Sequence, residues 1–353
     1  MAEPAPTPFK WKFIAFLKKI MNKDSTNFVQ HVYFKIKLGE WWKLYSRVTN
    51  SREDGITYLC PYRGTGDVYL ATRLLAASIG PDRVKESTVC VVGGSSVKVA
   101  KLFGFEDVKN LSQTEMDQMI ILGDVAGYSA LNLFVLHPDP PNSVTGISDH
   151  LRNYNGINFH DLYRAGVFGN EYMRSEPPKF DDASEKVKKF FEDNGLIPGK
   201  TIVIAPYVNT LNMLPTWFWI ELVHDMKRMG YTVCTNCDKD DDVIYGTTKL
   251  FPEYSEMKDF FEYAGFLVSS RSGLCEVICS FDICKIIVYQ PHQYWGEGTN
   301  ISYFSLNDMG LCSDAIEFEY EGIEFLKLKD KILMLLREWE DRHPKEEEEG
   351  GNE

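Results

Sequence analysis

The chain has 353 residues, 44% of them hydrophobic and 25% charged, which is typical of a soluble globular protein with room for two domains. Its formal net charge of −13 argues against nucleic acid as the main partner. The sequence has no apolar run of about 18 residues and no secretory signal, so we expect a cytoplasmic protein whose scattered cysteines stay reduced.

Residues 1–55 form a basic segment that we expect to be largely helical. Its first 50 residues carry nine Lys and Arg against three Asp and Glu. The sequence FKWKFIAFLKKIM at 9–21 has apolar side chains at helical spacing, with lysines around them. Two interpretations stay open. Residues 9–23 lie on an anionic membrane surface, which would make the protein peripheral to the inner face of the plasma membrane, or the helix packs on the body of the protein.

A first α/β domain is predicted for 56–182. Strands and helices alternate along it, and this order predicts a parallel sheet. The expected strands are 56–62, 87–94 and about 131–136, and the expected helices are 68–80, 95–105, about 113–122 and 157–169. The stretch 137–148 is rich in Pro and turn formers and is expected to line a cleft, while 170–182 is expected to be an interdomain linker.

A second α/β domain is predicted for 183–321, followed by a helix at 322–342 and a disordered acidic tail at 343–353. The expected strands are 200–207, 231–236, 266–268 and 285–290, with short strand-like pieces in 302–320. The expected helices are 183–194, one that starts at Pro215 and stops at Gly230, and one at 255–265 that Ser255 caps.

Two loops carry the candidate chemistry. The loop Arg63-Gly64-Thr65-Gly66-Asp67 joins a strand to a helix and is neither a P-loop nor GxGxxG. At this helix start Asp67 is either an N-cap or a general base that takes a proton from a hydroxyl, and one residue can serve both roles.

The second loop runs from Ser269 to Gly273, between a buried strand and an apolar helix. Such a loop suits an anion, and Arg271 would add a charged fork for phosphate. The alternative is a turn whose arginine makes a structural salt bridge. Ser272 is expected to cap the helix, and Gly273 to let the backbone approach a ligand.

The order of these motifs resembles the heptosyltransferase-like glycosyltransferases of the GT-B fold, a bacterial surface-polysaccharide family that includes ADP-heptose transferases. Gly66-Asp67 matches the Gly-Asp end of that family's first loop, and Ser272-Gly273 matches its Ser-Gly helix start. Leu214-Pro215-Thr216-Trp217 is loosely similar to its Trp-Pro helix start. The similarity covers roughly 56–290. The Lys that usually precedes Trp-Pro in the family is absent, because Met213-Leu214 stand there. Arg271 stands where an acid is common, so the resemblance implies no particular donor sugar.

The resemblance implies two Rossmann-like βαβ domains that face each other across a cleft, an acceptor domain followed by a nucleotide-sugar donor domain. It implies that Asp67 is the catalytic base and that the Ser272 loop holds the donor diphosphate. The donor-binding and phosphate-binding candidates are Arg271, Ser272, Gly273, Leu274, Tyr207, Asn209 and His292. The cleft and acceptor candidates are Arg63, Gly64, Thr65, Gly66 and Lys98. For His292 a loop role stays open, and for Arg63 and Lys98 a salt bridge does.

We therefore expect an enzyme that transfers a sugar from a nucleotide-sugar donor to a hydroxyl of a glycan or lipid-linked glycan in bacterial surface polysaccharide synthesis. With Asp67 as the base, the reaction would invert the anomeric carbon, and no metal or cofactor is expected, because cations and amides can hold the diphosphate. The alternatives are a GT-B nucleotide-sugar epimerase or hydrolase, and a non-catalytic GT-B-like scaffold in a polysaccharide assembly complex.

Overall fold

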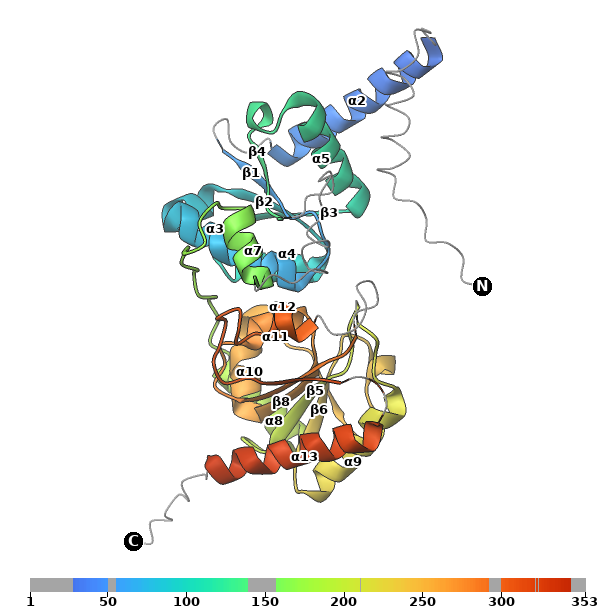
Figure 1. Ribbon diagram of the computed structural model, residues 1–353, viewed down its shortest axis with the longest axis vertical. Helices are drawn as coiled ribbons and strands as arrows, with labels where there is room; N and C mark the ends of the chain where they lie inside the picture. Colours follow the sequence, from blue (N-terminus) through green and yellow to red (C-terminus); the bar gives the residue numbers. More distant parts are fainter. Residues whose placement is uncertain are drawn as a thin grey trace.

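The computed structural model describes residues 28–49, 55–138, 157–209, 211–291, 300–320, 322 and 324–343 (Figure 1). These residues form two α/β domains, each built on a parallel sheet. Among the described helices, none combines the length and the apolar character that crossing a membrane requires.

The first domain contains a four-stranded parallel sheet in the order β3-β2-β1-β4. Its strands are β1 (Thr57–Leu59), β2 (Thr88–Val92), β3 (Asp107–Leu111) and β4 (Leu133–Val135). Its helical elements are α2 (Phe28–Thr49), α3 (Thr65–Glu86), α4 (Gly94–Lys101), α5 (Gln113–Ala126), η1 (Ser129–Leu131) and α7 (Phe159–Gly166). Between α7 and the next helix the chain has no helix or strand, in the stretch expected to be a linker.

The second domain contains a six-stranded parallel sheet in the order β10-β9-β8-β5-β6-β7, which is the Rossmann order. Its strands are β5 (Thr201–Ala205), β6 (Thr232–Asn236), β7 (Thr248–Leu250), β8 (Gly265–Ser270), β9 (Cys284–Tyr289) and β10 (Ile316–Glu319). Its helical elements are α8 (Ser184–Asn194), α9 (Thr216–Arg228), η2 (Asp240–Asp242), η3 (Tyr254–Glu256), α10 (Met257–Ala264), α11 (Gly273–Ile278), α12 (Asn300–Phe304) and α13 (Phe325–Arg342). The expected fold class, two Rossmann-like domains in the GT-B manner, is confirmed.

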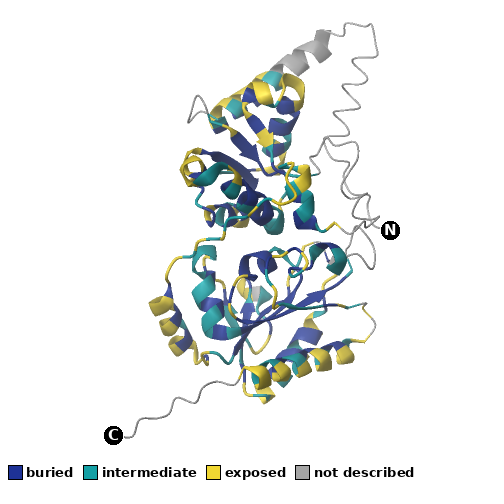
Figure 2. Ribbon diagram, turned by 60° about the vertical axis from the view of Figure 1, so that its left-hand side comes forward, coloured by how far each residue is buried: buried dark blue, intermediate teal, exposed yellow. Residues whose placement is uncertain are grey.

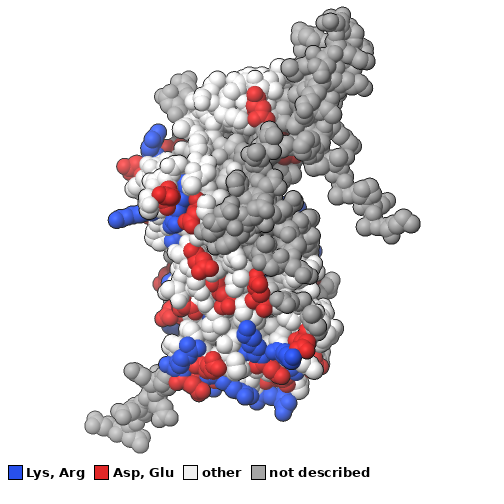
Figure 3. Space-filling view, in the orientation of Figure 1, with Lys and Arg blue, Asp and Glu red and all other residues white. Residues whose placement is uncertain are grey.

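Alternation along the strands decides which helix covers which face. In β5, Ile202 and Ile204 pack with α9 and α13, whereas Val203 packs with α8 and α10 on the opposite face. In β1, Leu59 faces α2 and α5 and Tyr58 faces α3. Both faces of each sheet are therefore buried, which explains the continuous apolar strands in the sequence (Figure 2). At the end of the molecule formed by α9 and α13, lysines, arginines and acids are interspersed (Figure 3).

The largest apolar core continues from the first domain into the second. It contains Tyr69 of α3 together with Cys279 at the end of α11, and the Tyr69 hydroxyl lies 3.8 Å from the Cys279 sulfur. The ring of Phe159 in α7 packs edge-on against Phe304 in α12, with centroids 5.1 Å apart. The two domains thus meet through buried side chains that flank the ends of their strands.

Several sequence predictions need correction. The strand Asp107–Leu111 was not expected, because its polar sequence DVKNL suits the edge of a sheet and lacks an apolar run. Residues 300–304 are helical where strand-like pieces were expected. Ser255 does not cap α10; Glu256 occupies that position and makes no side-chain cap. The prediction that the helix ends at Gly80 is confirmed: Gly80 has a non-helical φ of +78° and ψ of 164°, and Pro81 begins the second helical segment of α3.

Candidate functional site

The two sheets turn the carboxyl ends of their central strands toward each other. In a parallel α/β sheet, ligands bind outside the carboxyl ends where the strand order reverses, which here lies between β1 and β4 and between β5 and β8. The chain leaves β1 through the loop of Asp67 and leaves β8 through the loop of Arg271. The structure therefore brings together the two loops that the sequence singles out.

The first turns of α3 and α11 touch. A Cβ atom on Gly273 would overlap the Thr65 hydroxyl and lie 2.6 Å from the Gly66 backbone nitrogen. A Cβ atom on Gly66 would lie 2.9 Å from Oε1 of Glu276 in α11. The glycines at both helix starts therefore serve close packing of the domains, and Gly273 does not face open space for a ligand as expected.

Asp67 lies in the first turn of α3 with a side chain 29% exposed. Its Oδ1 atom is 3.3 Å from Nε2 of His137, which follows β4, and 3.3 Å from the hydroxyl of Tyr163 in α7. Because a carboxylate only accepts hydrogen bonds, both neighbours act as donors to Oδ1. The other oxygen, Oδ2, lies where a Cβ atom on Gly64 would be, and no described residue donates to it.

Aromatic rings hold His137 in place. Its ring meets Tyr62 edge-on at 4.4 Å between centroids, Tyr163 at 5.5 Å and Phe159 at 6.4 Å. Burial, followed by the nearby Asp67 charge, raises the pKa of Tyr163 well above its usual value, so its hydroxyl stays protonated and can donate. Burial also raises the pKa of Cys60 behind this cluster, which disfavours a thiolate nucleophile there.

The helix that carries Tyr163 is anchored to the second domain. The Asn158 side chain at the start of α7 donates to the Asp308 carbonyl at 2.8 Å. The buried His160 lies with Nδ1 2.8 Å from the Met309 carbonyl, and because a carbonyl only accepts, Nδ1 carries the proton. Burial lowers the pKa of His160 to about 4, so it is neutral at pH 7.

Arg271 does not offer its guanidinium to a ligand. The side chain is 8% exposed, and it pairs through two nitrogens with both carboxylate oxygens of Glu276. Two more of its N–H groups donate to the carbonyls of Ser272, at 2.7 Å, and Phe304, at 3.1 Å. The structural salt bridge, one of the two interpretations, is therefore observed, and the phosphate-binding role of Arg271 stays a prediction.

The rest of that loop also differs from expectation. Ser272 occupies the N-cap position of α11 but makes no side-chain capping bond. Leu274 is buried in the core shared by the two domains. The helix α11 has only six residues, and its start is covered by α3.

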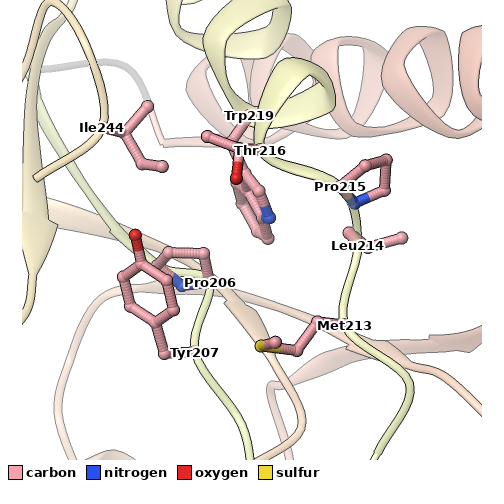
Figure 4. Close-up of a pocket in the computed structure, with 8 residues that line it drawn as sticks. All are labelled: Pro206, Tyr207, Met213, Leu214, Pro215, Thr216, Trp219 and Ile244. Atoms are coloured by element: carbon pink, nitrogen blue, oxygen red, sulfur yellow. The ribbon is translucent and has the colours of Figure 1, made fainter. Parts of the chain in front are cut away.

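A cavity of about 240 Å³ opens in the second domain, after the carboxyl ends of β5 and β6 (Figure 4). Its lining is mostly apolar and includes Pro206, Met213, Leu214, Pro215 and Ile244, together with Tyr207, Thr216 and Trp219. Trp219 is buried, and its indole N–H has no partner within the described part of the chain. The cavity thus offers mostly apolar walls, which suit a flat ring.

The remaining candidates occupy separate places. Tyr207 lines this cavity and donates its hydroxyl to the Asp242 carbonyl, and Asn209 is exposed nearby in sequence. Arg63 is exposed, with its Cγ atom 3.7 Å from where a Cβ atom on Gly93 would be. Lys98 pairs with Glu253 of the second domain at 2.7 Å, so the salt-bridge alternative is observed for it. His292 and residues 9–23 lie outside the described residues.

Sequence reasoning missed three residues that define this region, namely His137, Tyr163 and Glu276. His137 stands at the start of the Pro-rich stretch that was expected to line a cleft, directly after a strand, and this position is the signal that could have selected it. Tyr163 and Glu276 reach the site only through packing of α7 and α11, and nothing in their local sequence marks them.

No family model matches the chain, and no curated protein matches it. Among solved structures, the chain is similar to the glycosyl transferase family 9 protein of Veillonella parvula, with 14% identity, 81% of this chain and 96% of that chain covered, and a TM-score of 0.48. It is also similar to the E. coli ADP-heptose LPS heptosyltransferase II, with 12% identity, 81% and 99% covered, and a TM-score of 0.49. An E. coli heptosyltransferase solved with ADP gives 13% identity, 80% and 99% covered, and a TM-score of 0.48.

The resemblance that the motifs suggest is therefore found among solved structures as well. At these identities and TM-scores the likeness assigns neither a family nor an activity to the chain. An activity has to come from the chain's own residues.

Proposed function

We propose that the protein is a glycosyltransferase that moves a sugar from a nucleotide-sugar donor to a hydroxyl of a glycan or lipid-linked glycan. The observation that carries the proposal is the position of Asp67, a partly exposed carboxylate at the carboxyl edge of the first sheet, where that edge meets the second domain. A base at one edge and a nucleotide seat at the other are what transfer between two Rossmann-like domains requires.

The second domain supplies the candidate nucleotide seat. The cavity beside β5 and β6 has mostly apolar walls that include Tyr207 and Trp219, and it lies at the carboxyl edge where Rossmann sheets bind ligands. We propose that it receives the base or ribose of the donor. Tyr207, whose ring lines the cavity, would then contact the donor as the sequence analysis expects.

With Asp67 as the base, the reaction is an inverting displacement. The acceptor oxygen bonds to the anomeric carbon, its proton passes to Asp67, and the nucleotide diphosphate leaves with the electron pair of the broken C–O bond. We propose that no metal is needed, and that the site works on surface polysaccharide at the inner face of a membrane. Full activity in the presence of EDTA is the expected result for metal independence.

The test begins with a calorimetric screen of nucleoside diphosphates, followed by transfer assays with the matching nucleotide sugars. Asp67→Asn should keep nucleotide affinity and lower transfer by orders of magnitude, because it removes the base with little change of shape. Asp82→Asn is the matched control, since Asp82 is an exposed acid on the same helix. Transfer by Asp67→Asn at the wild-type rate would refute the role of this carboxylate.

One observation favours a second candidate, a non-catalytic scaffold with the same fold. Glu276 occupies the guanidinium of Arg271, and α3 covers Gly273, where a diphosphate was expected. A scaffold predicts that no nucleotide binds at all. Heat from any nucleoside diphosphate in the screen, abolished by filling the cavity with Thr216→Trp, would rule the scaffold out.

A further inference from the structure

We propose that Tyr163 and His137 are positioning residues for Asp67, and that α7 makes this positioning depend on the arrangement of the two domains. The proposal rests on the proposed function. In this proposal Oδ1 of Asp67 is held by hydrogen bonds, and Oδ2 accepts the proton from the acceptor hydroxyl.

The geometry around the carboxylate is asymmetric. Oδ1 receives two donors, from Tyr163 and His137, each at 3.3 Å. Oδ2 receives no donor from the described residues and lies against Gly64, which has no side chain to cover it. Two bonds on one oxygen stop rotation of the carboxylate and leave its other oxygen for a hydroxyl of the acceptor.

The donors themselves are rigid. Tyr163 is fully buried, and its raised pKa keeps the hydroxyl proton in place. His137 is 9% exposed in its side chain and is wedged among Tyr62, Phe159 and Tyr163. Hydrogen bonds from two fixed donors therefore hold the Asp67 carboxylate in one orientation.

The other titratable and charged groups around this carboxylate come from each element packed on it. They are Cys60 after β1, Tyr62 and Arg63 in the loop before α3, and Glu276 with its partner Arg271 beyond Gly66. Replacing Tyr163 or His137 leaves all of these groups in place, so a change in the Asp67 carboxyl signal reports the lost donor.

The second domain controls Tyr163 through α7. Asn158 and His160 bond to the carbonyls of Asp308 and Met309, and Phe159 packs on Phe304. All three contacts cross from the first domain into the second, and they come from the five residues that precede Tyr163. In the proposal, the hydroxyl of Tyr163 bonds to Asp67 when the second domain contacts α7. The orientation of the catalytic base is thereby coupled to domain closure.

The experiment follows the carboxyl carbon of Asp67 by NMR in the full-length protein without substrate, with the signal assigned by comparison with Asp67→Asn. It also measures kcat and KM for transfer. Tyr163→Phe and His137→Leu should each move or broaden the carboxyl signal, because the carboxylate loses a fixed donor. Each should lower kcat about tenfold or more, with KM nearly unchanged.

Two controls separate positioning from structure. His137→Gln restores an amide donor and should return kcat and the Asp67 carboxyl signal toward the wild type. Tyr69→Phe removes a buried hydroxyl from α3 that faces Cys279 and should leave both unchanged. For the coupling, His160→Leu should lower kcat in the wild type and have little further effect in Tyr163→Phe, a non-additivity expected for residues that act through one contact.

The outcomes distinguish the two proposals. If the wild type binds no nucleotide and transfers no sugar, the proposed function fails, and the NMR signal still tests whether the two donors hold Asp67. If transfer depends on Asp67 while Tyr163→Phe and His137→Leu leave the carboxyl signal and kcat unchanged, the positioning role is wrong and the proposed function stands. Additive effects of His160→Leu and Tyr163→Phe would refute the coupling.

Discussion

The loop after β1 and the loop after β8 have the same local design and opposite outcomes. Each leaves a buried parallel strand, passes a basic residue and glycine, and enters an apolar helix. In the first loop Asp67 keeps a partly exposed carboxylate with one oxygen held and the other open. In the second loop Arg271 is enclosed by its own helix, because Glu276 stands one turn further on. Whether the charged side chain of such a loop is available to a ligand therefore depends on whether the helix that follows the loop carries an oppositely charged partner.

The largest effect should come from breaking the enclosed pair. Glu276→Gln leaves the buried Arg271 charge without its counter-ion, and the free energy of unfolding should fall by about 3 to 5 kcal/mol. Urea unfolding measures this. The double variant Arg271→Met with Glu276→Leu should recover most of the loss, because it removes both charges. A loss below about 1 kcal/mol in Glu276→Gln would mean that Arg271 is not committed to this pair.

His160, which anchors α7 to the second domain, should make the free energy of unfolding depend on pH. The expected effect is nearly as large as that of Glu276→Gln. The pKa of His160 is lowered to about 4 in the folded protein, because burial disfavours the charged ring. The unfolded chain, with a pKa of about 6.5, binds the proton first, so stability is complete above pH 6.5 and falls as the pH drops toward 4. The loss should reach about 3 kcal/mol.

Chemical unfolding between pH 4 and pH 7 measures this loss. In His160→Gln the contribution of His160 to the slope of unfolding free energy against pH should disappear. The contributions of acidic groups elsewhere should remain. The same slope in both proteins would mean that His160 is not buried against Met309 in solution.

The glycines at the helix starts give a smaller effect. Gly273→Ala places a methyl group against Thr65 and the backbone of Gly66, so α3 and α11 must separate, at a cost of about 1 to 3 kcal/mol. Gly94→Ala is the matched control, because nothing lies within 4 Å of its added methyl group. Equal thermal stabilities of the two variants would contradict the direct packing of these helices.

The smallest effect belongs to the exposed contact between the domains. Lys98 and Glu253 form a pair at 2.7 Å, with side chains 41% and 60% exposed. Glu253→Gln should lower stability by less than about 1 kcal/mol, and added salt should remove the difference. The ratio of the stability losses in Glu253→Gln and Glu276→Gln measures how much burial increases the contribution of an ion pair to stability. A loss as large as that of Glu276→Gln would reverse the comparison.

Several features of the candidate site were readable from the sequence because they are local. Asp67 is marked by a glycine-bearing loop between a buried strand and an apolar helix, and the strands with both faces buried are marked by continuous apolar runs. The polar strand β3 escaped detection, since a strand at a sheet edge needs no apolar run. Arg271 was recognised as a charge in a loop, but its partner could not be chosen between a ligand and a neighbouring acid.

By itself the sequence determined two α/β halves, the order of their elements and the loop that carries Asp67, because strand and helix patterns and βα turns are set within a few residues along the chain. Only the tertiary structure decided that His137 and Tyr163 meet Asp67, that Glu276 closes off Arg271 and that α3 abuts α11. These contacts join residues 5 to more than 200 positions apart, and their distances follow from how helices pack on two sheets.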